Sequence, residues 1–299
     1  MERAFWGFIF GDAFGVPVEF LERDTFHISD MEGYGSWDVP EGTWSDDSAM
    51  TFILMEQLAQ GGTVNDLKQA YCDWVFRGHW TYNGEPAFDV GITVREIVSR
   101  WERIGFSEVA QSDEWSNGNG ALMRILPVAF LTYKKDYSIE DTVIAYARLT
   151  HGHIRSSLCC IHYTYVVHNL LDGYSKEESI RLANTRFDLL LEHYETERGH
   201  FARLDGIGSL KRDDIRSTGY VVDTLEAVYW SFLKSDSYMS TISTAVHLGK
   251  DTDTIGAIAG SLAGLYYDVL NVPAHWYNLV PKRAEIELLI QRFLGLFEE

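Results

Sequence analysis

Helical periodicity runs through most of this chain of 299 residues, and it limits the possible folds more than any other feature. Apolar residues recur every three or four positions, as on one face of a helix, in nine segments. These segments are residues 51–60, 67–77, 93–104, 139–149, 157–171, 176–194, 222–233, 238–248 and 255–267. Alternating strand patterns are scarce, only 6 prolines occur, and no segment is of low complexity. The sequence therefore predicts an all-α, compact, single-domain helical bundle over residues 1–299.

Two sets of glycines are spaced four residues apart, so each set lies on one stripe of a helix. The sets are Gly7, Gly11 and Gly15, and Gly256, Gly260 and Gly264. Each glycine destabilises a helix by about 1 kcal/mol relative to alanine, and close approach of a neighbouring helix would compensate for that. We expect both helices near the centre of the bundle, with the acidic clusters described next at the ends of their neighbours.

Two short acidic clusters lie about two hundred residues apart, and each combines two carboxylates with a hydroxyl group. They are Ser45-Asp46-Asp47 and Asp251-Thr252-Asp253-Thr254. Ser45 is a candidate N-cap for a helix that opens near Ser48, and the second cluster directly precedes the helix of residues 255–267. Ordinary helix capping explains either cluster alone. Together, their oxygen ligands suit a hard divalent cation such as Mg²⁺, Ca²⁺ or Mn²⁺.

Glu19 is a further candidate ligand-binding carboxylate. Pro17 disfavours helix at the preceding residue, so Glu19 is expected on a loop just past a helix end. There it either reaches a bound ligand or remains a solvated glutamate.

Six motifs in order resemble those of the ADP-ribosyl glycohydrolase family. They are residues 11–19, 42–48, 116–127, 150–151, 219–225 and 249–255, and the resemblance spans residues 4–268. It implies an all-α protein with a central dinuclear metal cleft that hydrolyses an ADP-ribosyl bond. One departure is serine at positions 45 and 48, where threonine is commoner in the family; the hydroxyl ligand is kept.

The resemblance also implies roles for individual residues. The metal-binding positions, for two divalent cations, Mg²⁺ or Mn²⁺, are Ser45, Asp46, Asp47, Asp251, Asp253 and Thr254. Glu19 matches a glutamate near the ribose and Asp89 an aspartate near the substrate, so these two are the candidate catalytic residues. His151 matches a histidine near the substrate.

The remaining candidates would bind the substrate. They are Asn117, Gly118, Asn119, Gly120, Met123, Gly219 and Tyr220. The glycines permit close backbone approach, so this loop either cradles a diphosphate or forms a plain turn. Tyr220 is the first choice for stacking on adenine. Arg124 would pair with a phosphate or with an acidic neighbour.

Charge and cysteine content narrow the possible partners and compartments. With 25 Lys+Arg against 44 Asp+Glu, the net charge of −19 disfavours nucleic acids and anionic membranes. The three cysteines, Cys72, Cys159 and Cys160, form no disulfide framework, which favours a reducing, cytoplasmic compartment. No apolar stretch reaches the roughly 20 residues that span a bilayer, so we expect no membrane partner.

The favoured function is metal-dependent removal of mono-ADP-ribose from a modified protein or small molecule, with ADP-ribosyl-arginine as the first choice. One alternative keeps the site but changes the bond, to a serine, nucleic-acid or small guanidine linkage. Another is an ADP-ribose recognition or immunity protein that neutralises an ADP-ribosyltransferase by binding. The loops of residues 80–88 and 195–216 are candidates for contacting the leaving group.

Overall fold

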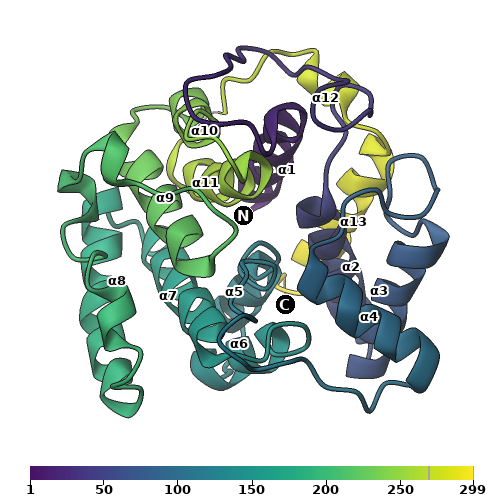
Figure 1. The fold of residues 1–299 in the computed structure, drawn as a ribbon, viewed down its shortest axis with the longest axis horizontal. Coiled ribbons are helices and arrows are strands. Elements are labelled where there is room, and N and C mark those ends of the chain that lie inside the picture. The colour runs from purple at the N-terminus through teal and green to yellow at the C-terminus, as the bar shows by residue number, and fades with distance from the viewer. Residues whose placement is uncertain (269, 299) are drawn as a thin grey trace.

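The computed structural model describes residues 1–268 and 270–298 of the chain. Within these ranges the chain forms α-helices joined by loops and short 3₁₀ turns, and the only β-type pairing is an isolated bridge between Gly118 and Tyr220 (Figure 1). The predicted all-α fold is confirmed. No helix in the described ranges has the length and apolar character needed to cross a lipid bilayer.

All nine helices predicted from periodicity are present. They are α2 (Asp46–Gln60), α3 (Val64–Arg77), α4 (Ile92–Ile104), α6 (Ile139–Ala147), α7 (Ile154–Leu171), α8 (Lys176–Leu190), α9 (Val221–Lys234), α10 (Tyr238–Val246) and α11 (Thr252–Tyr266). Helices α2 and α11 begin earlier than predicted because polar residues fill their first turns, where an apolar stripe gives no signal. Ser45 is the N-cap of α2, and its Oγ accepts the N–H of Asp47.

In the described ranges four helices lie outside the nine periodic segments: α1 (Glu2–Gly15), which the glycine spacing predicted, and α5 (Leu126–Lys134), α12 (Trp276–Leu279) and α13 (Arg283–Gly295), which were not predicted. Helix α5 is buried on nearly every side, so its sequence lacks an amphipathic period. Helix α12 is a single turn and too short to show one. Helix α13 has an ordinary buried face, formed by Ile286, Leu289, Ile290 and Phe293, which its periodicity indicates.

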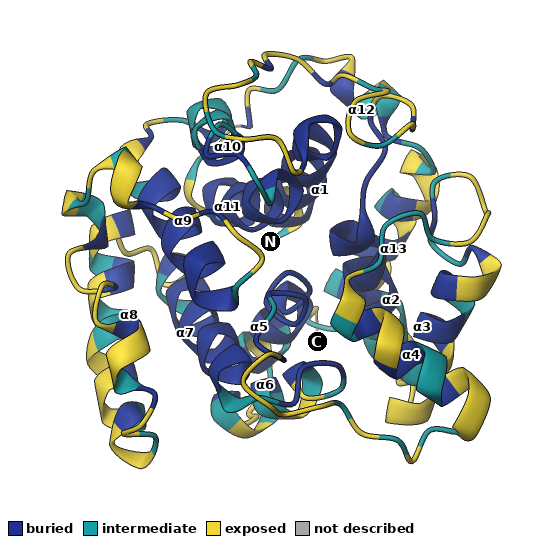
Figure 2. Ribbon diagram, in the orientation of Figure 1, coloured by how far each residue is buried: buried dark blue, intermediate teal, exposed yellow. Residues whose placement is uncertain are grey.

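The two glycine stripes face each other at the centre of the bundle. Helix α1 (Glu2–Gly15) runs antiparallel to α11, and a methyl group added at Gly11 would overlap the carbonyl oxygen of Gly256. Gly7 and Gly260 make the same close approach one turn away. Both helices are buried along nearly their whole length (Figure 2). The predicted packing is confirmed except in one respect: the second acidic cluster begins α11 itself rather than a neighbouring helix.

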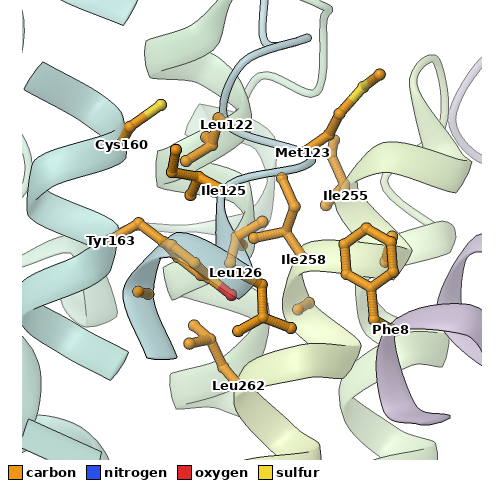
Figure 3. Close-up of a cluster of buried hydrophobic side chains, with 14 of the residues drawn as sticks. Phe8, Leu122, Met123, Ile125, Leu126, Cys160, Tyr163, Ile255, Ile258 and Leu262 are labelled. Atoms are coloured by element: carbon orange, nitrogen blue, oxygen red, sulfur yellow. The ribbon is translucent and has the colours of Figure 1, made fainter. Parts of the chain in front are cut away.

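The hydrophobic core surrounds the middle of these two helices. Figure 3 shows Phe8 of α1, Leu126 of α5 and Tyr163 of α7 around Ile258 of α11. The hydroxyl groups of Tyr163 and Ser261 form a buried hydrogen bond of 2.7 Å, so the polar end of this ring is satisfied. This packing fixes the position of α11 and therefore of the acidic residues at its start.

Candidate functional site

A cavity of about 830 Å³ opens where the starts of α2 and α11 meet the loops that precede α4, α5 and α9. Twelve of the sequence-predicted site residues line it. They are Glu19, Asp46, Asp89, Gly118, Asn119, Gly120, Met123, His151, Gly219, Asp251, Asp253 and Thr254. Ser45 and Asp47 are buried directly behind this wall. Residues separated by more than two hundred positions therefore share one site.

Asp12 of α1 holds the first acidic cluster in place through hydrogen bonds. Its buried carboxylate accepts the backbone N–H groups of Ser45 and Ser48, both at 3.0 Å, and the hydroxyl of Ser48 at 2.5 Å. These contacts tie α1 to the first turn of α2. Asp46 and Asp47 then project from that turn, where the helix dipole favours negative charge.

A direct hydrogen bond joins the two acidic clusters. The hydroxyl of Thr254 donates to Oδ2 of Asp47 at 3.1 Å, and the hydroxyl of Ser45 donates to the same oxygen, also at 3.1 Å. Asn119 donates its side-chain amide to Oδ2 of Asp251 at 2.6 Å, so the loop before α5 contacts the second cluster as well.

The antiparallel packing of α1 and α11 brings Glu19 to the second cluster. A short 3₁₀ turn, Val16–Val18, follows α1, and Glu19 comes directly after it, as the proline predicted. The N–H of Phe20 donates to the carbonyl of Lys250 at 2.6 Å. This hydrogen bond holds the segment that contains Glu19 beside the start of α11. One carboxylate oxygen from each of Glu19, Asp251 and Asp253 lies within 4.8 Å of the other two.

Burial raises the pKa of six carboxyl groups around the two acidic clusters, and repulsion from neighbouring carboxylates raises it further in each of them except Asp251. Burial raises the pKa of Glu19 to about 8, with the charges of Asp251 and Asp46 adding to the rise and a hydrogen bond from Trp37 Nε1, at 2.5 Å, opposing it. Burial likewise raises the pKa of Asp46 to about 7, and it places the pKa values of Asp47, Asp89 and Asp253 well above the ordinary one. Burial also raises the pKa of Asp251.

The charge balance and the ligand chemistry of the cluster fit a divalent cation. Arg95 and Lys250 are the only positively charged residues among those that line the cavity, since His151 is neutral, and Lys250 already pairs with Glu22. Oδ1 of Asp47 is buried and has no hydrogen-bond partner in the described chain, so it is free to ligate. Carboxylate and hydroxyl oxygens are ligands that Mg²⁺ and Mn²⁺ accept.

The glycine-rich loop before α5 forms another part of the cavity wall, next to Asp251. The N–H of Asn119 donates to the carbonyl of Gly219 at 3.0 Å, so the loops before α5 and α9 are joined. A Cβ at Gly120 would lie 2.7 Å from Cε1 of His151, which explains why glycine is needed there. Burial lowers the pKa of His151 to about 3, so this ring is neutral at physiological pH.

Two predicted substrate residues, Asn117 and Tyr220, do not line the cavity. The hydroxyl of Tyr220 lies 3.3 Å from Nη1 of Arg155, beside the cavity wall. Arg124 forms no ion pair with an acidic residue of the described chain, because its guanidinium donates to the backbone carbonyls of Gly120 and Tyr146. Arg124 thus supports the glycine-rich loop from inside the core.

Sequence reasoning missed Asp12 and Trp37 as parts of the site. Asp12 had a detectable signal, because it is a lone carboxylate in the otherwise apolar run of residues 4–16. A buried aspartate needs several hydrogen-bond donors, and the start of α2 provides them. Trp37 lies in an irregular loop, and nothing local in the sequence points to its contact with Glu19.

Comparisons with known proteins agree over nearly the whole chain. A family model described as ADP-ribosylglycohydrolase matches residues 2–299. The chain is 32% identical over 291 residues to the ADP-ribosylarginine hydrolase Tri1 of Pseudomonas putida (strain GB-1), covering 96% of this chain and 76% of the relative. It is 31% identical to the ADP-ribosyl-[dinitrogen reductase] glycohydrolase of Rhodospirillum rubrum, covering 95% and 91%. A solved structure described as an ADP-ribosylglycohydrolase-related protein complex aligns with a TM-score of 0.78 at 29% identity, over 98% of this chain and 96% of that one.

Proposed function

The chain belongs to the ADP-ribosylglycohydrolase family, and from this premise we propose that it is a metal-dependent hydrolase that removes mono-ADP-ribose from modified arginine. The observation that carries the proposal is the hydrogen bond from Thr254 to Asp47, which joins two acidic clusters at the wall of one cavity. The arginine linkage is supported by the relatives of P. putida and of Serratia proteamaculans (strain 568), both described as ADP-ribosylarginine hydrolases.

The proposed cofactor is a pair of divalent cations, Mg²⁺ or Mn²⁺. The residues that would hold them are Ser45, Asp46, Asp47, Asp251, Asp253 and Thr254. When bound, such cations orient the ribose hydroxyls and lower the pKa of a bound water. Asp12 would not contact the cations itself; it would orient the backbone of the first cluster, whose residues bind them.

Glu19 is our candidate for moving the proton, with Asp89 as the second choice. Hydrolysis at the anomeric carbon passes through an oxocarbenium-like state, in which the bond to water oxygen forms while the bond to the leaving nitrogen breaks. The Glu19 carboxylate would take the proton that the water loses and then give it to the departing guanidine nitrogen, so the carboxylate is regenerated. A carboxyl group with a pKa near neutrality suits such transfers.

The loop before α5 would hold the diphosphate. His151 would contact the substrate as a neutral ring. Because the N–H of Asn119 is used by Gly219, backbone contact with phosphate would fall to Gly118 and Gly120. The hydroxyl of Tyr220 accepts from Arg155 and the residue does not line the cavity, so we propose a role for Tyr220 at the edge of the site rather than inside it.

We further propose that residues 1–299 form one catalytic domain that works in the cytoplasm on an ADP-ribosylated protein or small molecule. Cys72, Cys159 and Cys160 are all buried and unpaired, which suits a reducing compartment. The net charge of −19 weighs against a nucleic-acid substrate.

The test is release of free ADP-ribose from an arginine-modified protein. We expect release with Mg²⁺ or Mn²⁺, loss of release with EDTA, and loss in Asp46→Ala and Asp251→Ala. Asp136→Ala is the matched control, because Asp136 is exposed and does not line the cavity; this variant should remain active. A parallel panel with serine, cysteine and nucleotide linkages tests the acceptor. Stoichiometric binding of ADP-ribose without release would overturn the hydrolase proposal and favour a recognition or immunity protein.

A further inference from the structure

We infer that a groove along α4 receives the polypeptide around the modified residue of a protein substrate and selects acidic side chains there. This inference rests on the proposed function. The groove measures about 680 Å³ and is lined by Val90, Ile92, Arg95, Arg100, Arg103 and Gln111, among others. We call it the α4 groove.

The α4 groove is continuous with the active-site cavity. Val90, Ile92 and Arg95 line both. The side chain of Ile92 is 80% exposed at this junction, so an apolar contact is available to a polypeptide that leaves the cavity. The loop of residues 195–216, predicted from sequence as a contact for the leaving group, contributes no lining residue to either space.

The charge that lines the groove is positive on balance, with three arginines against Glu96, in contrast to the acidic chain as a whole. Arg95 and Arg103 form no ion pair with any residue of the described chain, whereas Arg100 pairs with Glu108. Nε of Arg103 donates to the carbonyl of Ser99 at 3.3 Å, which holds this side chain along the helix. Two unpaired guanidinium groups on one helix are suited to carboxylate partners.

The dimensions of α4 set the length of the peptide. The helix rises about 1.5 Å per residue, so Arg95 and Arg103 lie about 12 Å apart along its axis. An extended peptide covers that distance in three or four residues at about 3.3–3.6 Å each. Two acidic residues about three or four positions apart in the peptide would therefore reach Arg95 and Arg103 together.

An acidic polypeptide fits the groove better than a nucleic acid does. Glu96 also lines the groove, Val90 and Ile92 offer apolar contacts, and no aromatic side chain is present for a base to stack on. The net charge of −19 would repel an extended polyanion beyond the groove.

The experiment compares three substrates: free ADP-ribosyl-arginine, an ADP-ribosylated arginine peptide with aspartates around the arginine, and the same peptide with asparagines. We expect Arg103→Glu to raise KM for the acidic peptide by about tenfold, with kcat and the turnover of free ADP-ribosyl-arginine unchanged. Glu96→Lys, at an exposed position of the same groove, should lower KM for the acidic peptide. Arg181→Glu on α8, at the opposite edge of the molecule from α4, makes the same charge change and should have no effect (Figure 1).

Each outcome decides the matter. The proposed role of the α4 groove would be wrong if the wild type had equal KM values for the acidic and neutral peptides, or if Arg103→Glu affected both peptides equally. Either result would leave the proposed function intact. Preference for an ADP-ribosylated oligonucleotide, lost in Arg103→Glu, would also show the proposed role of the groove to be wrong. Absence of turnover with free ADP-ribosyl-arginine and with every peptide would overturn the proposed function and the inference together.

Discussion

At the scale of single residues, Glu19 occupies the position where proton transfer and metal binding are hardest to separate. Its carboxylate lies beside Asp251 and Asp253, within reach of any ion that they bind, and it also lines the cavity that would hold the ribose. Trp37 fixes one of its oxygens. The same side chain is thus placed to be a ligand, a base or both.

The variant Glu19→Gln separates these roles. It keeps the shape of the side chain but removes its negative charge and its ability to take up a proton. We expect kcat to fall by about 10²–10⁴-fold, while the affinity for Mg²⁺, measured by calorimetry, changes little. Glu32→Gln, at an exposed position, is the matched control and should match the wild type. Loss of metal binding together with activity would instead make Glu19 a ligand.

Asp12 supports the site from within α1, and Asp12→Asn tests that support. Asparagine has the same shape but presents two N–H donors where Ser45 and Ser48 already donate. We expect the free energy of unfolding to fall by about 1–3 kcal/mol, measured with denaturant, and Mg²⁺ affinity to fall with it. Asp136→Asn is the exposed control. Wild-type stability and wild-type metal affinity in Asp12→Asn would show that this contact is dispensable.

The sequence indicated the acidic and glycine-rich residues that surround the cavity, because such residues cluster locally in the chain. The lone carboxylate of Asp12 in an apolar run signals a buried aspartate, but neither the partners of Asp12 nor the contact of Trp37 with Glu19 is indicated, because each contacts a residue on another element. The pairing of Asp12 with the start of α2 depends on how α1 sits beside α2, and no local pattern encodes that. Arg124 shows the same limit, since its partners are backbone carbonyls.

At the scale of elements, the close packing of α1 against α11 positions the site. The antiparallel contact sets the end of α1, with Glu19 just beyond it, against the start of α11. The four-residue glycine spacing predicted that each of these helices is closely approached by a neighbour near the centre of the bundle, but not that the two approach each other. Helix α5, by contrast, is buried on nearly all sides, so its sequence lacks the alternation of apolar and polar faces on which the prediction of helices depends.

The variant Gly11→Ala tests the contact between the two helices. The added methyl group would overlap the carbonyl oxygen of Gly256, and neither backbone can move freely. We expect the free energy of unfolding to fall by about 1–3 kcal/mol, measured by denaturant titration. Gly295→Ala is the matched control, since Gly295 is also helical and has open space around it; there alanine should be neutral or stabilise by up to about 1 kcal/mol. Equal effects of the two changes would contradict the packing argument.

At the scale of the whole molecule, the acidic cluster opposes folding unless protons or cations neutralise it. The pKa of Glu19 rises from its ordinary 4.5 to about 8 and that of Asp46 from 3.8 to about 7. A carboxyl group whose pKa is higher in the folded state stabilises that state when protonated. The contribution is fully present below the unfolded pKa and is lost as the pH rises through the folded value. The metal-free protein should therefore lose stability between about pH 5 and pH 8.

Metal addition should reverse this loss, and more strongly at pH 8 than at pH 6, because protons compete with the cation for the same carboxylates. At a Mg²⁺ concentration 100 times the Kd, the stabilisation should be about 2.7 kcal/mol, which corresponds to a rise in Tm of about 5 °C for a chain of this size. Thermal melts at both pH values, with EDTA or Mg²⁺, measure it. The Asp46→Ala and Asp251→Ala variants should show little response to Mg²⁺. A shift in Tm that is as large at pH 6 as at pH 8, or that persists in both variants, would place the cation elsewhere on this acidic surface.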